Sequence, residues 1–193
     1  MYTSLVTSLT LATAAFAAPL QPRQFTYQQT NPFGIYAVSA EESSEYDGYA
    51  LVNAHVGAGQ NALQLLDPTS QGPADLAYLN GTQQDFYSDS TRVVFNITGA
   101  NSAFEIRLPD AKTGSVGQVF SEPGEGTASF SIGAENYLET AGGSSAGFIF
   151  WYACPTTSEA GYDVPSLFYG VEVQKQNLPS KECKQINIQA RFQ

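Results

Sequence analysis

The stretch Gln185-Ile-Asn-Ile-Gln-Ala-Arg-Phe192, close to the end of this 193-residue chain, decides the fold class. Its apolar and polar residues alternate one by one. Successive side chains of a β-strand point to opposite sides, so this alternation is typical of a strand with one buried face. Between Phe33 and Phe192 the sequence does not sustain the 3.6-residue period of an amphipathic helix. We therefore expect an all-β protein of antiparallel strands.

The same alternation recurs upstream and predicts further strands. It covers residues 91–98, 104–108 and 127–132. Residues 48–56 and 61–66 predict a hairpin that turns at Gly57-Ala-Gly59.

The segment Phe148-Ile-Phe-Trp-Tyr-Ala-Cys154 is apolar on both faces and predicts a central strand that buries Phe150 and Trp151 on opposite sides. Residues 166–173 are expected to pair with it. Turn signals such as Asn80-Gly81 recur at short spacing. Together these features predict a single-domain antiparallel β-sandwich or barrel of about ten to twelve strands, with a β-trefoil as the alternative.

Residues 1–17 have the layout of a secretory signal peptide, an uncharged run that ends in the small-x-small triplet Ala15-Phe16-Ala17. The run is shorter than the roughly 20 apolar residues of a membrane anchor, so we expect secretion and no membrane span. Residues 18–32 are polar and Pro-punctuated and predict a flexible leader, in which Arg23 marks a candidate second trimming site. Residues 33–193 form the expected all-β domain.

Secretion implies an oxidising compartment, so the two cysteines, Cys154 and Cys183, are expected to form a disulfide between the central and the C-terminal strand. Their Cα atoms should then lie about 4.4–6.8 Å apart. Asn80-Gly-Thr82 and Asn96-Ile-Thr98 are N-glycosylation sequons. We expect both asparagines to be modified, Asn80 in a turn and Asn96 at an outward strand position.

The charge of the chain excludes some classes of partner. It has 18 acidic residues against 8 basic ones, a net charge of −10. Such a surface adds negative charge to a nucleic acid or an anionic membrane, so neither is an expected partner. The sequence does not define an oligomeric state.

The motifs that could carry chemistry are weak. Gly57-Ala-Gly-Gln-Asn-Ala62 matches the spacing of a dinucleotide fingerprint, but strand-like residues follow it, so a hairpin turn is favoured and no cofactor is expected. His55 is the only histidine, which excludes a multi-histidine metal site, and no nucleophile elbow accompanies it.

A glycosidase needs two carboxylates held roughly 5–10 Å apart, and no pair stands out from the sequence. The acidic residues instead cluster in one loop or lie near turns: Glu41, Glu42, Glu45, Asp47, Glu122, Glu125, Glu135 and Glu139. We therefore expect no catalytic residue and no metal site.

Most aromatic residues fall at inward strand positions and predict core filling. The residues left over as candidate ligand-facing groups are His55, Tyr46, Tyr49, Tyr162 and Tyr169. His55 falls on the strand face of Leu51 and Asn53, opposite an apolar set that includes Val56.

Three parts of the chain resemble a family of small secreted fungal β-proteins without an assigned activity. They are Tyr46-Asp-Gly-Tyr-Ala-Leu-Val-Asn-Ala-His-Val-Gly-Ala-Gly-Gln-Asn61, Tyr78-Leu-Asn-Gly-Thr-Gln-Gln-Asp-Phe86, and the C-terminal set Trp151-Tyr-Ala-Cys154, Val164-Pro-Ser-Leu-Phe-Tyr169 and Leu178-Pro-Ser-Lys-Glu-Cys183. In the last third, Ala-Cys-Pro followed by a second Cys is also similar to the PhiA-like fungal cell-wall proteins. The resemblance implies turns, core and disulfide, and it supplies no catalytic residue.

The function expected from these observations is that of a secreted, non-catalytic protein of the cell wall or extracellular medium, acting by binding or structure. Its expected partners are a cell-wall polysaccharide or a host surface macromolecule. A secreted polysaccharide hydrolase and an effector-like protein that binds a host macromolecule are the alternatives.

Overall fold

The computed structural model describes residues 27–40, 45–57, 59–97, 103–109, 116–124, 126–141, 149–157, 163–171 and 178–193. The expected signal peptide and Arg23 lie outside these residues. The sequence predicts a flexible leader up to residue 32. In the structure, however, Tyr27–Gln29 forms strand β1, which pairs with β5 (Leu76–Thr82). The Pro-rich composition could not reveal this strand, since its partner lies about 50 residues away.

Strands dominate the described residues. Their bounds are β1 (Tyr27–Gln29), β2 (Phe33–Ser39), β3 (Ala50–Gly57), β4 (Gln60–Leu66), β5 (Leu76–Thr82), β6 (Arg92–Phe95), β7 (Phe104–Arg107), β8 (Val116–Gln118), β9 (Phe120–Pro123), β10 (Phe130–Ile132), β11 (Leu138–Thr140), β12 (Ile149–Thr157), β13 (Asp163–Val171) and β14 (Lys184–Phe192). The short helices α1 (Pro68–Gln71) and α2 (Gln83–Tyr87) and a 3-10 turn, η1 (Ala134–Asn136), lie between strands.

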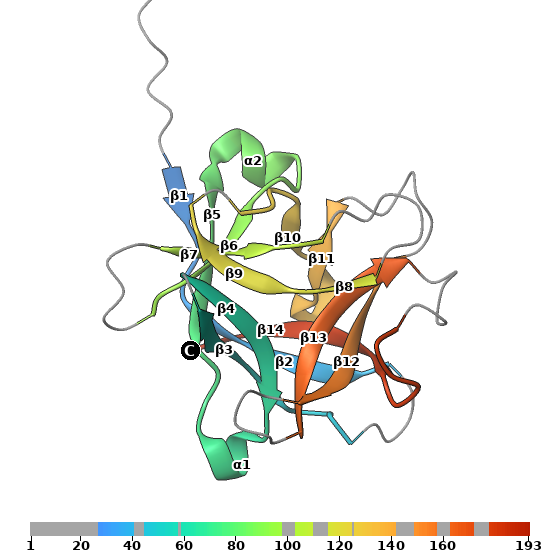
Figure 1. The fold of residues 1–193 in the computed structure, drawn as a ribbon. Helices are drawn as coiled ribbons and strands as arrows, with labels where there is room; N and C mark the ends of the chain where they lie inside the picture. The colour runs from blue at the N-terminus through green and yellow to red at the C-terminus, as the bar shows by residue number, and fades with distance from the viewer. Residues whose placement is uncertain are drawn as a thin grey trace, which may run out of the picture.

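Twelve of these strands join in one antiparallel sheet, in the order β1-β5-β6-β7-β9-β4-β3-β2-β14-β12-β13-β8. The sheet folds back on itself at two places, because β2 also pairs with β5 and β4 also pairs with β13. Figure 1 shows the strands wrapped around a common interior, with α2 at one end and α1 at the other. The all-β prediction is confirmed, and the double closure makes the sheet barrel-like.

The segment from β8 to β9 links β13 to β4, at one of the two places where the sheet closes. β8 pairs with β13, whereas β9 pairs with β4 and β7. Between them Val119 is fully buried, its N–H donates to Leu167 O at 2.9 Å, and its carbonyl accepts from the N–H of Leu63 at 3.2 Å. One continuous chain thereby connects two regions of the sheet, which fixes the position of β9 beside the β3–β4 hairpin.

The central strand is confirmed, with one correction. β12 lies between β13 and β14, and Trp151 is 7% exposed in the main core. Phe150, in contrast, is only partly buried, against a second apolar cluster formed around Tyr152. The reason is its position in the ladder: it faces Gly170, which has no side chain, and lies beyond the end of the β12–β14 pairing.

The turn predicted at Asn80-Gly81 is wrong. Both residues lie inside β5, which continues to Thr82. There Thr82 and Asp85 form a capping box, and α2 begins. The chain reverses through α2 instead, because the box supplies hydrogen-bond partners for the first turn of that helix.

The predicted disulfide is confirmed. Cys154 on β12 is bonded to Cys183, which directly precedes β14. The Cα atoms are 4.1 Å apart, slightly closer than the expected range. The bond ties the central strand to the C-terminal strand, as the sequence predicts.

Candidate functional site

The candidate site lies at the tip of the β3–β4 hairpin. Two glycines make the tip, Gly57 with φ +127° and Gly59 with φ +80°, values that side-chain-bearing residues rarely adopt. The register shifts between His55 and Gly57, so the tip carries an irregularity that bends it. The hairpin reading is therefore confirmed over the dinucleotide fingerprint, because the motif joins two antiparallel strands rather than a strand and a helix.

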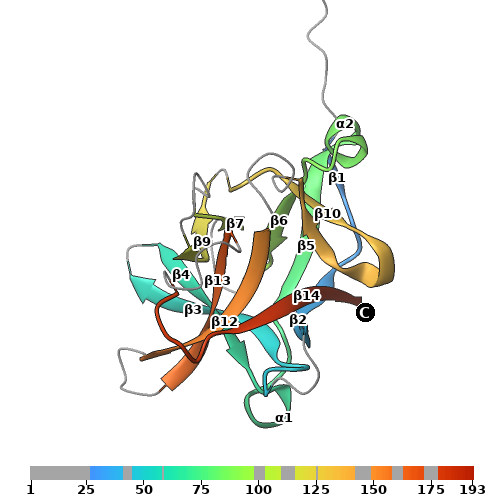
Figure 2. The ribbon, with the colours of Figure 1, turned by 90° about the vertical axis from the view of Figure 1, so that its right-hand side faces the viewer.

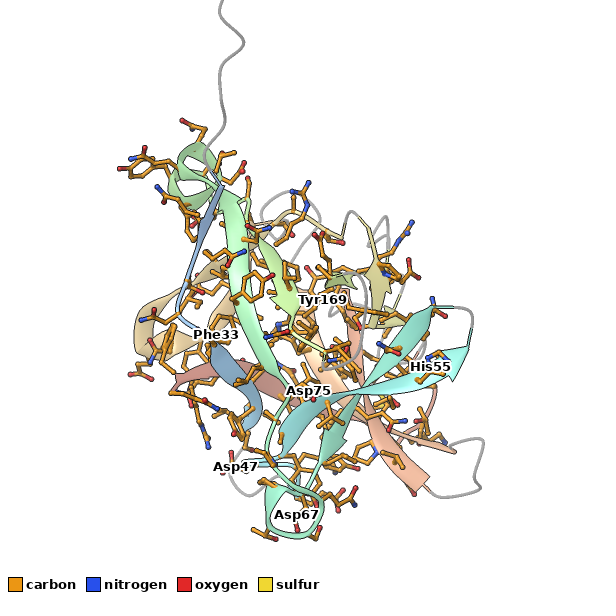
Figure 3. All side chains as sticks on the ribbon, turned by 90° about the vertical axis from the view of Figure 1, so that its left-hand side faces the viewer. Phe33, Asp47, His55, Asp67, Asp75 and Tyr169 are labelled. Atoms are coloured by element: carbon orange, nitrogen blue, oxygen red, sulfur yellow. A yellow bond between two sulfur atoms is a disulfide. The ribbon has the colours of Figure 1, made fainter. Side chains whose placement is uncertain are left out.

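An open hollow of about 610 Å³ lies beside this tip, and we call it the hairpin hollow. Its lining combines the tip with the neighbouring end of β9: Val56, Gly57, Gly59, Gln60, Glu122 and Pro123. Val56 is 39% exposed, so an apolar side chain borders the opening. Figure 3 shows His55 close to the same tip, at the periphery of the molecule.

Glu122 is the ionisable group of this lining. Its Oε2 accepts from Arg107 at 2.9 Å and its Oε1 accepts from the Gln60 amide at 2.5 Å. The carboxylate side chain is 28% exposed and that of Arg107 is 64% exposed. Glu122 is thus held in place from both sides while still reaching the hollow.

A second carboxylate lies directly opposite. The register pairs Glu105 of β7 with Glu122 of β9. Like charges in this position destabilise a sheet unless they are compensated. Here Glu105 has its own partners, since it accepts from the Gly126 N–H at 2.6 Å and lies 3.7 Å from Arg92 Nε. Two arginines and two glutamates therefore form a neutral ladder across β6, β7 and β9.

The opposite face of the hairpin carries a polar network. Asn53 donates to Asp75 Oδ2 from its backbone at 2.7 Å and from its side chain at 3.1 Å, and it accepts from Ser121. Ser121 is fully buried and lies opposite Asn61, which is 5% exposed. This network satisfies buried polar groups at the end of the barrel interior.

His55 contacts this network only through Asn61. Its Nδ1 lies 3.3 Å from Asn61 Oδ1, and the side chain is exposed. Within the described residues no hydroxyl or carboxylate is hydrogen-bonded to the His55 ring. The face it shares with Leu51 is the inward one, since Leu51 is fully buried while Val56 is exposed. The register places Leu51 opposite Leu65 and Asn53 opposite Leu63, and both leucines of β4 are fully buried.

Two of the four candidate tyrosines are buried, which corrects their assignment as ligand-facing. Tyr46 is 8% exposed and packs edge-on against Tyr49 at 5.6 Å. Burial, followed by the nearby Glu45 carboxylate, raises the pKa of Tyr46 to about 12. Tyr49 is itself partly buried against the core.

Tyr169 is 3% exposed, lies 4.8 Å from the Trp151 ring, and shares a hydrogen bond of 2.8 Å with Thr140. Burial raises its pKa, partly offset by that hydrogen bond. The side chain of Tyr169 points from β13 into the main core, and Figure 3 labels it there. Tyr162 lies outside the described residues. Of the candidate ligand-facing residues, His55 alone is described and exposed.

The two sequons differ in their surroundings. Asn96 is exposed and directly follows β6. Asn80 lies within β5, opposite Gln29 and Arg92, and its Oδ1 is buried without a hydrogen-bond partner. The prediction that Asn80 lies in a turn is therefore wrong, and the prediction that Asn96 points outward is confirmed.

Sequence reasoning missed Glu105 as a partner of Glu122. The alternation in 104–108 places Glu105 and Arg107 on one strand face, a signal of a charged ladder, but the partner strand depends on long-range pairing. It also missed the partly buried Asn53–Ser121 contact, for which the sequence holds no local signal.

Among the described residues, no group of three metal-binding side chains could hold an ion. In the same part of the chain, none of the helices has the length and apolar character to cross a membrane. The Cys154–Cys183 disulfide is compatible with a secreted protein.

The fold and the site define a disulfide-linked, antiparallel all-β protein with a polar hollow at a hairpin tip. The chain belongs to the family described as Domain of unknown function (DUF7907), whose model matches residues 20–192. Neither the curated proteins nor the solved structures gave a match to this chain.

Proposed function

We propose that the protein is a secreted, non-catalytic binding protein of the cell wall or the surrounding medium, and that it holds a polysaccharide in the hairpin hollow. The observation that carries this proposal is the engagement of Glu122 by Arg107 and Gln60. A general acid or base must exchange its proton with the substrate, whereas both oxygens here are engaged by donors of the scaffold. Each oxygen retains a second lone pair, which suits the hydroxyl groups of a sugar.

The remaining lining supports the same ligand class. Val56 and Pro123 offer apolar contact beside the carboxylate, and ligand sites typically combine an apolar lining with a few fixed polar groups. The resemblance to small secreted fungal β-proteins and to PhiA-like cell-wall proteins supports the extracellular setting. The exposed sequon Asn96 is in keeping with that setting.

A glycan array probed with the purified secreted protein tests this proposal. We expect binding to a subset of wall polysaccharides and a loss of about tenfold or more in affinity for Glu122→Gln, because the fixed acceptor loses its charge. Glu135→Gln removes the same charge from an exposed residue outside the hollow and should bind as the unmodified protein does. Absence of any glycan binding, or equal loss in both variants, would overturn the proposal.

A polysaccharide hydrolase is the second candidate, and one observation favours it. Glu105 and Glu122 are direct cross-strand neighbours, and glycosidases act with two carboxylates roughly 5–10 Å apart. Glu105 lies outside the lining of the hollow, with its side chain 14% exposed, and this favours the binding role. Release of new reducing ends from a polysaccharide, lost by orders of magnitude in both Glu105→Gln and Glu122→Gln, would establish the hydrolase instead.

A further inference from the structure

A second hollow lies at the disulfide end of the molecule, and we call it the disulfide hollow. Its volume is about 340 Å³, and its lining includes Tyr152, Leu178, Ser180, Lys181, Lys184 and Gln185. This volume is at the small end of the range for ligand sites. Tyr152 belongs to the second apolar cluster, against which Leu178 and Cys183 pack. The floor is therefore apolar, and the polar side chains surround it.

The charge of this hollow is opposite to that of the protein. The chain carries a net charge of −10 with only 8 basic residues. Arg92 and Arg107 are used in the ladder, where each faces a glutamate. Lys181 and Lys184 are both exposed, and within the described residues neither forms an ion pair. Two cations with no ion-pair partner among the described residues thus border one small hollow on a protein of net charge −10.

Glu182, which lies between the two lysines in sequence, does not line the hollow. The lining of the hollow thus includes both lysines and not this carboxylate.

The two lysines have different places in the site. Lys181 lies in the turn before Cys183, beside the apolar floor. Lys184 is the first residue of β14 and pairs with Ala153, whose side chain belongs to the main core. Because successive side chains of a strand point to opposite faces, the side chains of Lys184 and Gln185 lie on opposite faces of β14. Lys181 is therefore the residue at the hollow itself, and Lys184 borders its rim.

The backbone of the site is held in place. The disulfide fixes Cys183 to β12, and the pairing of Tyr152 with Gln185 continues from it directly. A site built on strands and a covalent link loses little conformational freedom when a ligand binds. Gln185 has no side-chain hydrogen bond to another described residue, so its amide is available to a ligand.

From these observations we infer that the disulfide hollow binds a carboxylate-bearing sugar, a uronate unit of an acidic polysaccharide. A lysine ammonium is a point charge suited to a carboxylate, and the amide and the Ser180 hydroxyl suit sugar hydroxyls. Leu178, which packs against the buried Tyr152, offers an apolar surface to the face of the ring. This inference does not depend on the proposed role of the hairpin hollow, which is lined by other residues.

Ionic strength decides how the net charge affects this binding. At 0.15 M salt the Debye length is about 8 Å, so the distant carboxylates of the protein are screened while a lysine in contact with the ligand is not. Binding of a uronate at physiological salt is therefore compatible with the overall negative charge.

Calorimetric titration of the full secreted protein with trigalacturonate at 0.15 M salt tests the inference, with the carboxyl-reduced, neutral trisaccharide as the matched ligand. We expect binding of the acid alone. Lys181→Gln should weaken the binding by about tenfold, because it removes a charged contact, and Lys184→Gln should weaken it by less. Lys181→Arg keeps the charge and should retain most of the affinity.

The control variant Gln83→Glu/Gln84→Glu adds two negative charges on α2, which lies far from this hollow in both ribbon views, and should bind as the unmodified protein does (Figure 2). Circular dichroism of each variant verifies folding. No heat of binding for the acid, equal binding of the neutral trisaccharide, or an equal loss in the α2 control would each overturn the inference. Loss of binding in Glu122→Gln with Lys181→Gln unaffected would place the uronate in the hairpin hollow and overturn it as well.

Discussion

Single acidic side chains in this protein are held by donors close to them in sequence or across one strand. Asp67 accepts from Thr69, and Asp85 accepts from the backbone and hydroxyl of Thr82. These contacts lower the pKa of both carboxyls, because hydrogen bonds to the charged form favour it. Asp67 and Asp85 therefore have structural partners, and Glu122 differs because it also reaches a hollow.

The lowered pKa of Asp85 predicts how the stability of the protein depends on pH. A carboxyl whose pKa is lowered by folding stabilises the protein above its unfolded pKa of about 3.9, and this contribution is lost as the pH falls through the lower, folded value. Asp85→Ala should cost about 1 kcal/mol at pH 7 through the lost hydrogen bonds of the capping box. Urea unfolding at several pH values should show the difference shrinking below about pH 4. Gln84→Ala, in the same helix, should show no such acid dependence.

The sequons give a second prediction at this scale. We expect a glycan at Asn96, which is exposed, and much lower occupancy at Asn80, whose side chain is partly buried between β1 and β6. Mass analysis of the protein secreted from a eukaryotic host should lose one glycan in Asn96→Gln and change little in Asn80→Gln. Full occupancy at Asn80 would show that its side chain is accessible when the glycan is attached.

At the scale of elements, local alternation predicted the strands whose inner face is set by their own residues. β14 and the β3–β4 hairpin follow from it, whereas the β12–β13 pair follows from a run that is apolar on both faces. Local alternation failed where a distant partner decides whether a strand forms or which side chains it buries. β1 forms only through its pairing with β5, and Tyr169 is buried because its side of β13 faces the main core. The opposition of Glu105 and Glu122 likewise depends on the β7–β9 register, which no local pattern contains.

The disulfide is the element-scale contact with the largest expected effect. It links residues 29 positions apart, and closing a loop of this length removes entropy from the unfolded chain. Cys154→Ala/Cys183→Ala should lower the free energy of unfolding by about 3–4 kcal/mol in that description. Chemical denaturation measures the loss. Two free thiols in the unreduced secreted protein would contradict the bond itself.

At the scale of the whole molecule, a neutral ladder of two arginines and two glutamates lies on a protein whose net charge is −10. The long-range pairing of β9 with β4 positions β9 beside the β3–β4 tip and so creates the hairpin hollow. The fold class and the hairpin could be predicted from the sequence, but the hollow could not, because its lining comes from segments about 60 residues apart that only the β4–β9 pairing brings together. The central claim is that this hollow binds sugar without transforming it.

The most direct test of that claim is an NMR titration of the isotope-labelled secreted protein with a soluble oligosaccharide identified on the array, followed by analysis of the sugar after long incubation. We predict saturable shifts of the amide signals of Val56, Gly57, Gln60 and Glu122, with the oligosaccharide recovered intact. Shifts confined to other parts of the sheet, or the appearance of shorter sugars that Glu122→Gln abolishes, would contradict it.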